Sequence, residues 1–194
     1  MSGGLSITLD ASALEKIGNL IGAAGNKAPL ALARAINHTG DKARTKMVRA
    51  LAGQTGLKIS TTRKALRITK AGAGGLAYVI QSKGGNIRLK YFGARETRAG
   101  VSAAPWNKRT IYPHTFMKAG WWPKRVTKSN WNGQVFERAG SKTASMDRFH
   151  VVRSGLFIPD EMVTGASAEA FYGSVDTDLA SRLAHELLQV IGGR

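Results

Sequence analysis

The sequence predicts an α+β fold, in which an antiparallel sheet packs with a long N-terminal helix and a C-terminal helix. Helical periodicity is strongest near the two ends of the chain, whereas strand-length patterns dominate residues 76–159. A hydrophobic content of 43% is enough to bury a core. A chain of 194 residues is typical of one domain. We therefore expect an N-terminal arm at 1–27 followed by a single α+β domain at 28–194.

The first third of the chain is expected to be mainly helical. Residues 5–10 alternate between apolar and polar side chains, which predicts a short strand, and a weak helix is expected at 11–21. The pattern over 28–51 is the clearest helix. Gly40 is expected to weaken it by about 1 kcal/mol relative to Ala, and Gly53 to end it. Its apolar stripe consists of Leu32, Ile36, Ala43, Met47 and Leu51.

A second, shorter basic helix is predicted from 60 to about 70, with Ser60 or Thr61 as its N-cap. The glycine-rich stretch 71–75 then ends the helical region. It lacks the Gly-Lys-Ser/Thr ending of a phosphate-binding loop, so we interpret it as a connector.

The pattern changes to strand after these glycines. Residues 76–81 are mostly apolar, and 87–91 alternate cleanly, which predicts a hairpin connected through 82–86. The alternation places Arg88 and Lys90 on one face of the second strand. Further strands are expected at 99–103, 115–118, 134–138 and 149–153.

The segment 104–133 is expected to form an excursion of loops, because its prolines exclude most of it from central strands. It contains all four tryptophans of the chain. The closing helix is predicted over 167–191, capped by Ser167 or Asp176, and Gly173 is a candidate interruption. Its apolar face consists of Leu179, Leu183, Leu187 and Val190 or Ile191.

Positive charge is concentrated in the middle of the chain. Between Lys42 and Phe136 there are 20 Lys and Arg but a single acid, Glu96, so this segment has a net charge of +19, against +17 for the whole chain. From Asp160 onward the net charge is −4. A cationic block of this size repels itself, which favours a polyanion or acidic partner subunits nearby.

The sequence offers no catalytic or metal-binding constellation. Its four histidines are scattered without metal-ligand spacing, and it has no cysteine. Carboxylates are too scarce in the basic block to assemble a two-metal nuclease centre easily. We therefore expect no enzyme, no catalytic residue, no metal and no cofactor. No apolar run is long enough for a membrane span, and no signal-peptide pattern is present, so we expect no membrane partner.

The basic block has two interpretations, which the residues leave open. Lys42, Lys46 and Arg49 share a helix face, as Arg88 and Lys90 share a strand face, and each can meet phosphate groups without reading base sequence. They can equally be solvated or pair with acids of a neighbouring subunit. The candidate protein-interface residues are Trp106, Trp121, Trp122 and Trp131, of which the last three can instead form a local core, together with Asp176, Asp178 and Glu186 of the closing helix.

The order of these pieces resembles the minor tail protein Z family of lambda-like, long-tailed phages and prophages. The likeness covers most of the chain from about residue 28 and is carried by order and spacing. The segments that carry it are 31–37 with 42–44, 62–66, 89–102 leading to 114–117, 134–140, 151–159 and the closing helix.

The resemblance implies a non-enzymatic virion protein that completes the head-proximal end of the tail. It would be assembled in the host cytoplasm as a homo-oligomer, expected to be a hexameric ring, between the tail terminator or tube protein and the head-connector proteins. DNA would pass through the lumen without sequence-specific contacts. We expect the acidic closing helix to meet a basic block of an adjacent subunit or of another tail protein. The alternative is a stand-alone basic nucleic-acid-binding protein without sequence specificity.

Overall fold

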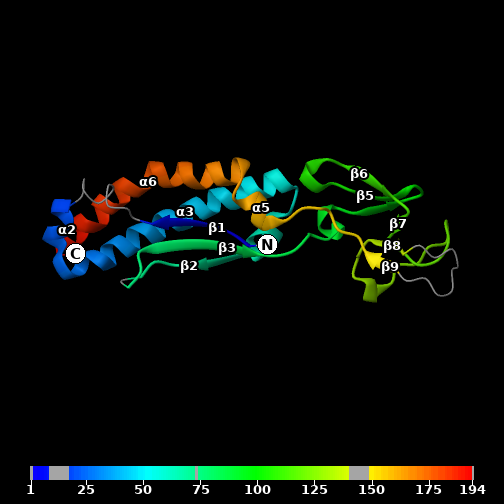
Figure 1. Cartoon of the computed structure of the whole chain (residues 1–194), viewed down its shortest axis with the longest axis horizontal. Helices are drawn as coiled ribbons and strands as arrows, with labels where there is room; N and C mark the ends of the chain where they lie inside the picture. The colour runs from blue at the N-terminus through cyan, green and yellow to red at the C-terminus, as the bar shows by residue number, and fades with distance from the viewer. Residues whose placement is uncertain (1, 9–17, 73, 140–148, 194) are drawn as a thin grey trace.

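The computed structural model describes residues 2–8, 18–72, 74–139 and 149–193 (Figure 1). It confirms the α+β class. The molecule is elongated, with two long helices and a three-stranded sheet in one half and two small sheets in the other. We call the first half the body and the second, which includes residues 94–138 and 149–153, the β lobe.

Two antiparallel helices form one layer of the body. Helix α3 (Ala28–Thr55) lies along α6 (Gly165–Ile191), and the short helices α2 (Gly18–Ala24) and η1 (Gly25–Lys27) precede α3. The predicted stripes face inward on both long helices. On α6, Leu183 and Leu187 pack against the alanine-rich start of α3, so the 3.6-residue periodicity identified the buried faces correctly. Gly53 and Gly173 interrupt neither helix; α3 ends at Gly56, which adopts the left-handed conformation.

The three-stranded sheet of the body has the order β1-β3-β2 and is antiparallel throughout. Strand β1 (Ser2–Thr8) pairs with the full length of β3 (Ala77–Lys83), from Ser2 opposite Lys83 to Thr8 opposite Ala77. The predicted strand at 5–10 is thus present, although 9 and 10 lie outside the described residues, as does most of the helix expected at 11–21. Because Leu5 and Ile7 are buried in the main core, residues 2–8 belong to the sheet rather than to an arm.

Two predictions for the region between α3 and the β lobe are wrong. Helix α4 (Ile59–Lys64) is shorter than expected, because Leu66–Thr69 forms β2, the edge strand next to β3. Its N-cap is Lys58 rather than Ser60 or Thr61, and no side chain caps it. The hairpin through 82–86 does not form, since β1 and β2 occupy both edges of β3. Residues Leu89–Phe92 are instead the 3-10 helix η2, whose three-residue repeat buries Leu89 and Phe92 together.

The β lobe consists of two further antiparallel sheets. One has the order β4 (Arg95–Thr97), β5 (Gly100–Ala103) and β6 (Thr110–Pro113), and the other has β7 (Thr115–Phe116), β8 (Phe136–Arg138) and β9 (Phe149–Val151). Strands β5, β7, β8 and β9 fall within predicted strands. Strands β4 and β6 were not predicted, and β6 lies in the segment 104–133 that was expected to form loops, where it pairs with β5. Short helices η3 (Pro105–Asn107), η4 (Ser129–Trp131) and α5 (Ile158–Met162) complete the chain.

Strand β3 packs closely against α3 where the ring of Tyr78 lies against Gly40. Tyr78 is fully buried, and a Cβ at Gly40 would lie 2.5 Å from its ring. The phenol donates a hydrogen bond to Asp41 Oδ1 at 2.7 Å, while Lys70 Nζ donates to Asp41 Oδ2 at 2.7 Å. Gly40 therefore leaves space for an aromatic ring between helix and sheet.

This network perturbs both acidic groups. Burial alone would raise the pKa of Asp41, but the hydrogen bonds from Lys70 and Tyr78, with the charges of Lys70 and Arg44, lower it below its usual value. Burial, followed by the hydrogen bond to Asp41 and its negative charge, raises the pKa of the Tyr78 phenol well above its usual value. The folded protein therefore favours a neutral phenol beside an ionised carboxylate.

The Tyr78→Phe variant is expected to lose about 1.5–3 kcal/mol of unfolding free energy at pH 7, because a hydrogen bond to a charged acceptor is removed. Since the phenol pKa is raised on folding, this stabilisation is fully present below about pH 10, the unfolded pKa, and is lost as the pH rises above it. The difference between wild type and variant should therefore narrow above pH 10 in urea unfolding curves. A constant difference up to pH 11 would contradict the assignment.

Candidate protein interface

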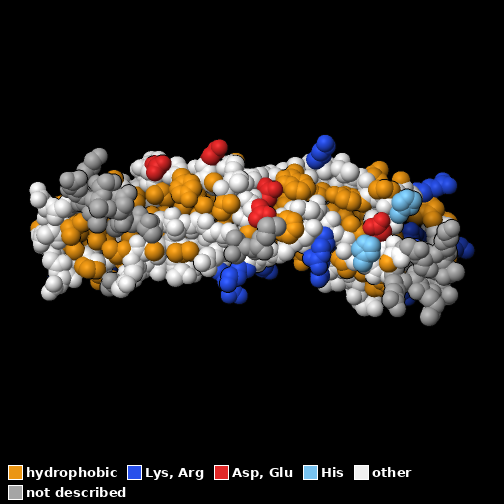
Figure 2. All heavy atoms as spheres, in the orientation of Figure 1, with side chains coloured by type: hydrophobic (Ala, Val, Ile, Leu, Met, Phe, Trp, Pro, Cys, Tyr) orange, Lys and Arg blue, Asp and Glu red, His pale blue; other side chains and the backbone are white. Residues whose placement is uncertain are grey.

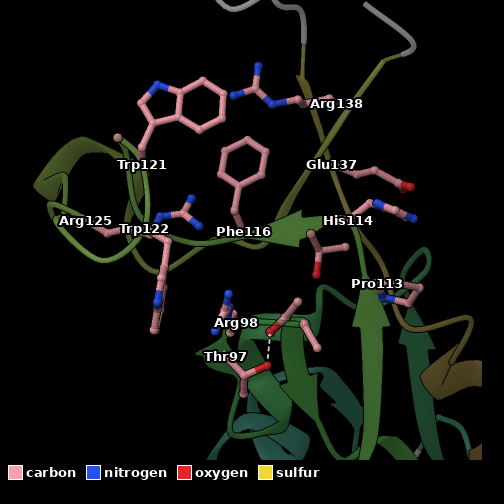
Figure 3. Close-up of a pocket in the computed structure, with 14 residues that line it drawn as sticks. Thr97, Arg98, Pro113, His114, Phe116, Trp121, Trp122, Arg125, Glu137 and Arg138 are labelled. Carbon is pink, nitrogen blue, oxygen red and sulfur yellow. Dashed lines mark hydrogen bonds between the residues drawn. The ribbon is translucent and has the colours of Figure 1, made fainter. Parts of the chain in front are cut away.

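A large open groove lies in the β lobe (Figure 3). Its volume is about 1010 Å³. The groove lies between the β4–β5 turn, the β6–β7 junction, strand β8 and the loop that carries two tryptophans. Its lining residues are Thr97, Arg98, Ala99, Gly100, Pro113, His114, Thr115, Phe116, Gly120, Trp121, Trp122, Arg125, Glu137 and Arg138.

A buried carboxylate fixes the loop that carries the tryptophans. The side chain of Glu96 is only 4% exposed and forms an ion pair with Arg125, Oε1 to Nη1, at 2.7 Å. Its other oxygen accepts a hydrogen bond from the Met117 backbone N–H at 2.8 Å. Arg125 also donates to the Lys118 carbonyl at 2.7 Å. The single acid of the basic block thus holds both ends of the segment 117–125, and this contact could not be read from the sequence.

The aromatic residues of the lobe divide into a packed group and an exposed pair. Trp131 is half-buried and packs with Phe116, Phe136 and Phe149, with ring centroids 5.0–5.9 Å apart except for 6.0 Å between Phe116 and Phe136. Trp131 therefore belongs to a local core. Among the exposed large hydrophobic side chains are Trp121 at 75% and Trp122 at 53%, which line the groove (Figure 3).

Cationic side chains surround these indoles. The Arg138 guanidinium lies 5.7 Å from the Phe116 ring centroid and 6.0 Å from that of Trp121. Arg98 is exposed and lines the groove from the β4–β5 turn. The one carboxylate among the lining residues, Glu137, lies 3.5 Å from His150 Nε2. Exposed indoles beside arginines are typical of protein-interface anchors.

Trp106 is fixed within the chain. It is 44% exposed, but its indole Nε1 donates to Glu161 Oε1 at 2.7 Å and so links the lobe to α5. This hydrogen bond gives Trp106 a structural role within the chain, which differs from the interface role expected from the sequence.

The three predicted basic residues of α3 differ in their surroundings. Lys42 forms an ion pair with Asp178 of α6 at 2.8 Å, whereas Lys46 and Arg49 are exposed on α3. The hydrogen bond from Lys42, with the charges of Lys42 and Lys46, lowers the pKa of Asp178, although burial acts in the opposite direction. Lys42 and Asp178 thus join α3 to α6 within one chain.

Arg88 and Lys90 do not share a strand face, because only Arg88 is extended and Lys90 lies in η2. They nevertheless converge on one side chain. When the Gln134 amide is oriented to accept, its oxygen lies 2.8 Å from Arg88 Nη1 and 3.1 Å from Lys90 Nζ. Lys90 also donates to the Asn132 carbonyl at 3.3 Å. Both residues therefore support the segment before β8.

The predicted acidic residues of α6 also differ in their surroundings. Glu186 is buried and pairs with Arg182 one turn earlier on the same helix, and Asp178 pairs with Lys42. Of the three predicted acids, only Asp176 is exposed. Two acids that were not predicted as interface residues, Asp160 of α5 and Glu169 of α6, are also exposed. Asp178 thus contacts a basic residue of its own chain, whereas the contact expected from the sequence was with an adjacent subunit or another tail protein.

Sequence reasoning missed a second basic surface. Arg44, Arg49 and Arg63 line one groove between α3 and α4, together with Thr45, Val48 and Ile59. Arg44 lies on the other side of the α3 apolar stripe from Lys42, and Arg63 comes from a helix whose placement no local pattern gives. Arg44 and Arg49 are five positions apart, about 140° around a helix, so their spacing did not indicate a shared groove.

The described part of the chain lacks two features. It holds no group of three His, Cys, Asp or Glu side chains placed to bind a metal ion. Among the same residues, no helix combines the length and the hydrophobicity that crossing a bilayer requires. Comparison with protein-family models, with curated proteins and with solved structures finds no match to this chain.

Proposed function

We propose that this protein is a structural component of a long-tailed phage virion, which completes the head-proximal end of the tail and joins it to the head connector. Copies of the chain associate into a ring, of six subunits by the sequence resemblance, around the path of the DNA. Assembly takes place in the host cytoplasm. The protein acts by binding its neighbours and carries out no reaction.

The observation that carries this proposal is the exposed Trp121 and Trp122 pair beside arginines, at one end of an elongated molecule. Elsewhere, acidic side chains lie over α6 and α5 on the face shown in Figure 2, whereas Lys and Arg lie mainly around the β lobe and the edge of the sheet. Such complementary surfaces favour heterologous contacts between copies, which form a ring when the rotation between neighbours closes. The sequence resemblance to minor tail protein Z supports the same function.

The Trp121→Ala/Trp122→Ala double variant tests the proposal. We expect wild type to form rings at low salt, seen by light scattering and electron microscopy. Loss of the two interface anchors together should cost at least about 2 kcal/mol, so the concentration for assembly should rise at least about 30-fold. Leu30→Ala, which truncates a side chain of 50% exposure at the other end of the molecule, should assemble as wild type.

The alternative of a stand-alone nucleic-acid-binding protein is favoured by the arginine groove between α3 and α4. The two functions differ in the state of the purified chain. A stable monomer that binds duplex DNA at micromolar concentration, with a steep salt dependence, would replace the tail proposal by this alternative.

A further inference from the structure

The groove between α3 and α4 is a concentrated cationic surface. It has a volume of about 300 Å³ and is lined by Arg44, Thr45, Val48, Arg49, Ile59 and Arg63. Two of its arginines come from successive turns of α3, and the third from the last turn of α4. Three guanidinium groups therefore face one hollow that no carboxylate lines.

These arginines have no ion-pair or hydrogen-bond partner among the described residues. The charge of Arg44 lowers the pKa of Asp41, which precedes it by one turn, but the two oxygens of Asp41 accept hydrogen bonds from Tyr78 and Lys70. Three like charges that share so little counter-charge repel one another, and this cost falls when an anion enters.

Acidic groups of this chain cannot supply enough of that counter-charge. Apart from the carboxylates engaged in the ion pairs and hydrogen bonds described above, Asp160, Glu169 and Asp176 are the exposed acids in the described part of the chain. Even if all three served a neighbouring copy, the net charge of +17 per subunit would remain. A ring of such subunits is therefore stabilised by an external polyanion.

We infer that the Arg44–Arg49–Arg63 groove binds the phosphate backbone of DNA. A guanidinium donates two parallel hydrogen bonds to a phosphate, and its planar fork suits this geometry better than an ammonium group does. The groove presents no aromatic ring for base stacking, so it contacts backbone without reading sequence. Of the basic residues expected from sequence to meet phosphate, Arg49 belongs to this site, whereas Lys42, Arg88 and Lys90 have partners within the chain.

This inference names the site at which the proposed ring would contact DNA. It rests on the proposed function only for the identity of the polyanion. Its test is the binding of a labelled 25-base-pair duplex, followed by fluorescence anisotropy from 50 to 300 mM salt. The variant is Arg44→Gln/Arg49→Gln/Arg63→Gln. The matched control, Arg34→Gln/Arg67→Gln/Lys83→Gln, removes three exposed cations outside the groove. Urea unfolding curves of both variants check that the fold is retained.

We expect the groove variant to bind the duplex at least about tenfold more weakly than the control at 100 mM salt. The slope of log K against log salt should fall by about 2–3, because each lost phosphate contact contributes about 0.9, while the control should lower it by less than about 1. If both variants lost the same affinity for the duplex, binding would depend on the overall positive charge and not on this groove. If polyglutamate of matched charge displaced the duplex as well as unlabelled DNA does, the ligand of the groove would be an acidic protein and not DNA.

Failure of the groove and failure of the tail proposal give different results. A groove variant that forms rings but binds DNA like the control contradicts only the site. A wild-type protein that binds DNA through the groove but never assembles supports the site and contradicts the tail function.

Discussion

The Arg125→Ala variant is expected to lose about 3–5 kcal/mol of unfolding free energy in the β lobe, since removing one partner of a buried pair leaves an uncompensated charge. The Glu96 side chain is 4% exposed, and without Arg125 its remaining partner is the Met117 N–H. The loop that carries Trp121 and Trp122 also loses its link to the Lys118 carbonyl. Urea unfolding followed by tryptophan fluorescence measures this, because all four tryptophans lie at 106–131.

Two comparisons show whether the loss comes from the ion pair. Lys124→Ala removes an exposed charge from the preceding position and should change stability by less than about 0.5 kcal/mol. The double variant Glu96→Ala/Arg125→Ala should be less destabilised than the sum of its single variants, because neither charge is then left buried alone. Simple additivity, or equal effects at Lys124 and Arg125, would show that the pair does not hold the loop.

The Gly40→Ala variant should lower the unfolding free energy of the body by about 1–3 kcal/mol, which is typical of inserting a group into a filled core. The added Cβ would meet the Cγ, Cδ2 and Cδ1 atoms of the Tyr78 ring at 2.5, 2.6 and 2.7 Å. The ring cannot swing away freely, because Tyr78 is fully buried and its hydroxyl is bound to Asp41. Helix propensity acts in the opposite direction by about 1 kcal/mol.

Gly53→Ala provides the matched control on the same helix. Nothing lies within 4 Å of the Cβ that it would add, and the residue is exposed within α3. Here only helix propensity applies, so the variant should be stabilised by up to about 1 kcal/mol. Thermal and urea unfolding of both variants measure the contrast. If Gly40→Ala were also stabilising, the packing of Tyr78 against α3 would have to be abandoned.

The sequence predicted which residues belong to the candidate interface, but not which of them are exposed and which are packed in a core. The sequence singles out tryptophans among basic residues, and exposure separates Trp121 and Trp122 from Trp131 only after folding. Phe136 and Phe149 lie in β8 and β9, and the sheet that joins them to β7 builds the core that receives Trp131. The role of Glu96 likewise depends on Arg125, which is 29 positions further along the chain.

The sequence by itself determined the α+β class, the inward faces of α3 and α6 and the concentration of positive charge in the middle of the chain. These follow from local periodicity and from composition, which need no knowledge of distant contacts. Only the tertiary structure decided that β3 pairs with β1 rather than with the segment that follows it, and that 66–69 is a strand. It also decided which cations are paired and which share a groove. Strand pairing and counter-charge join residues far apart in the chain, so no local pattern encodes them.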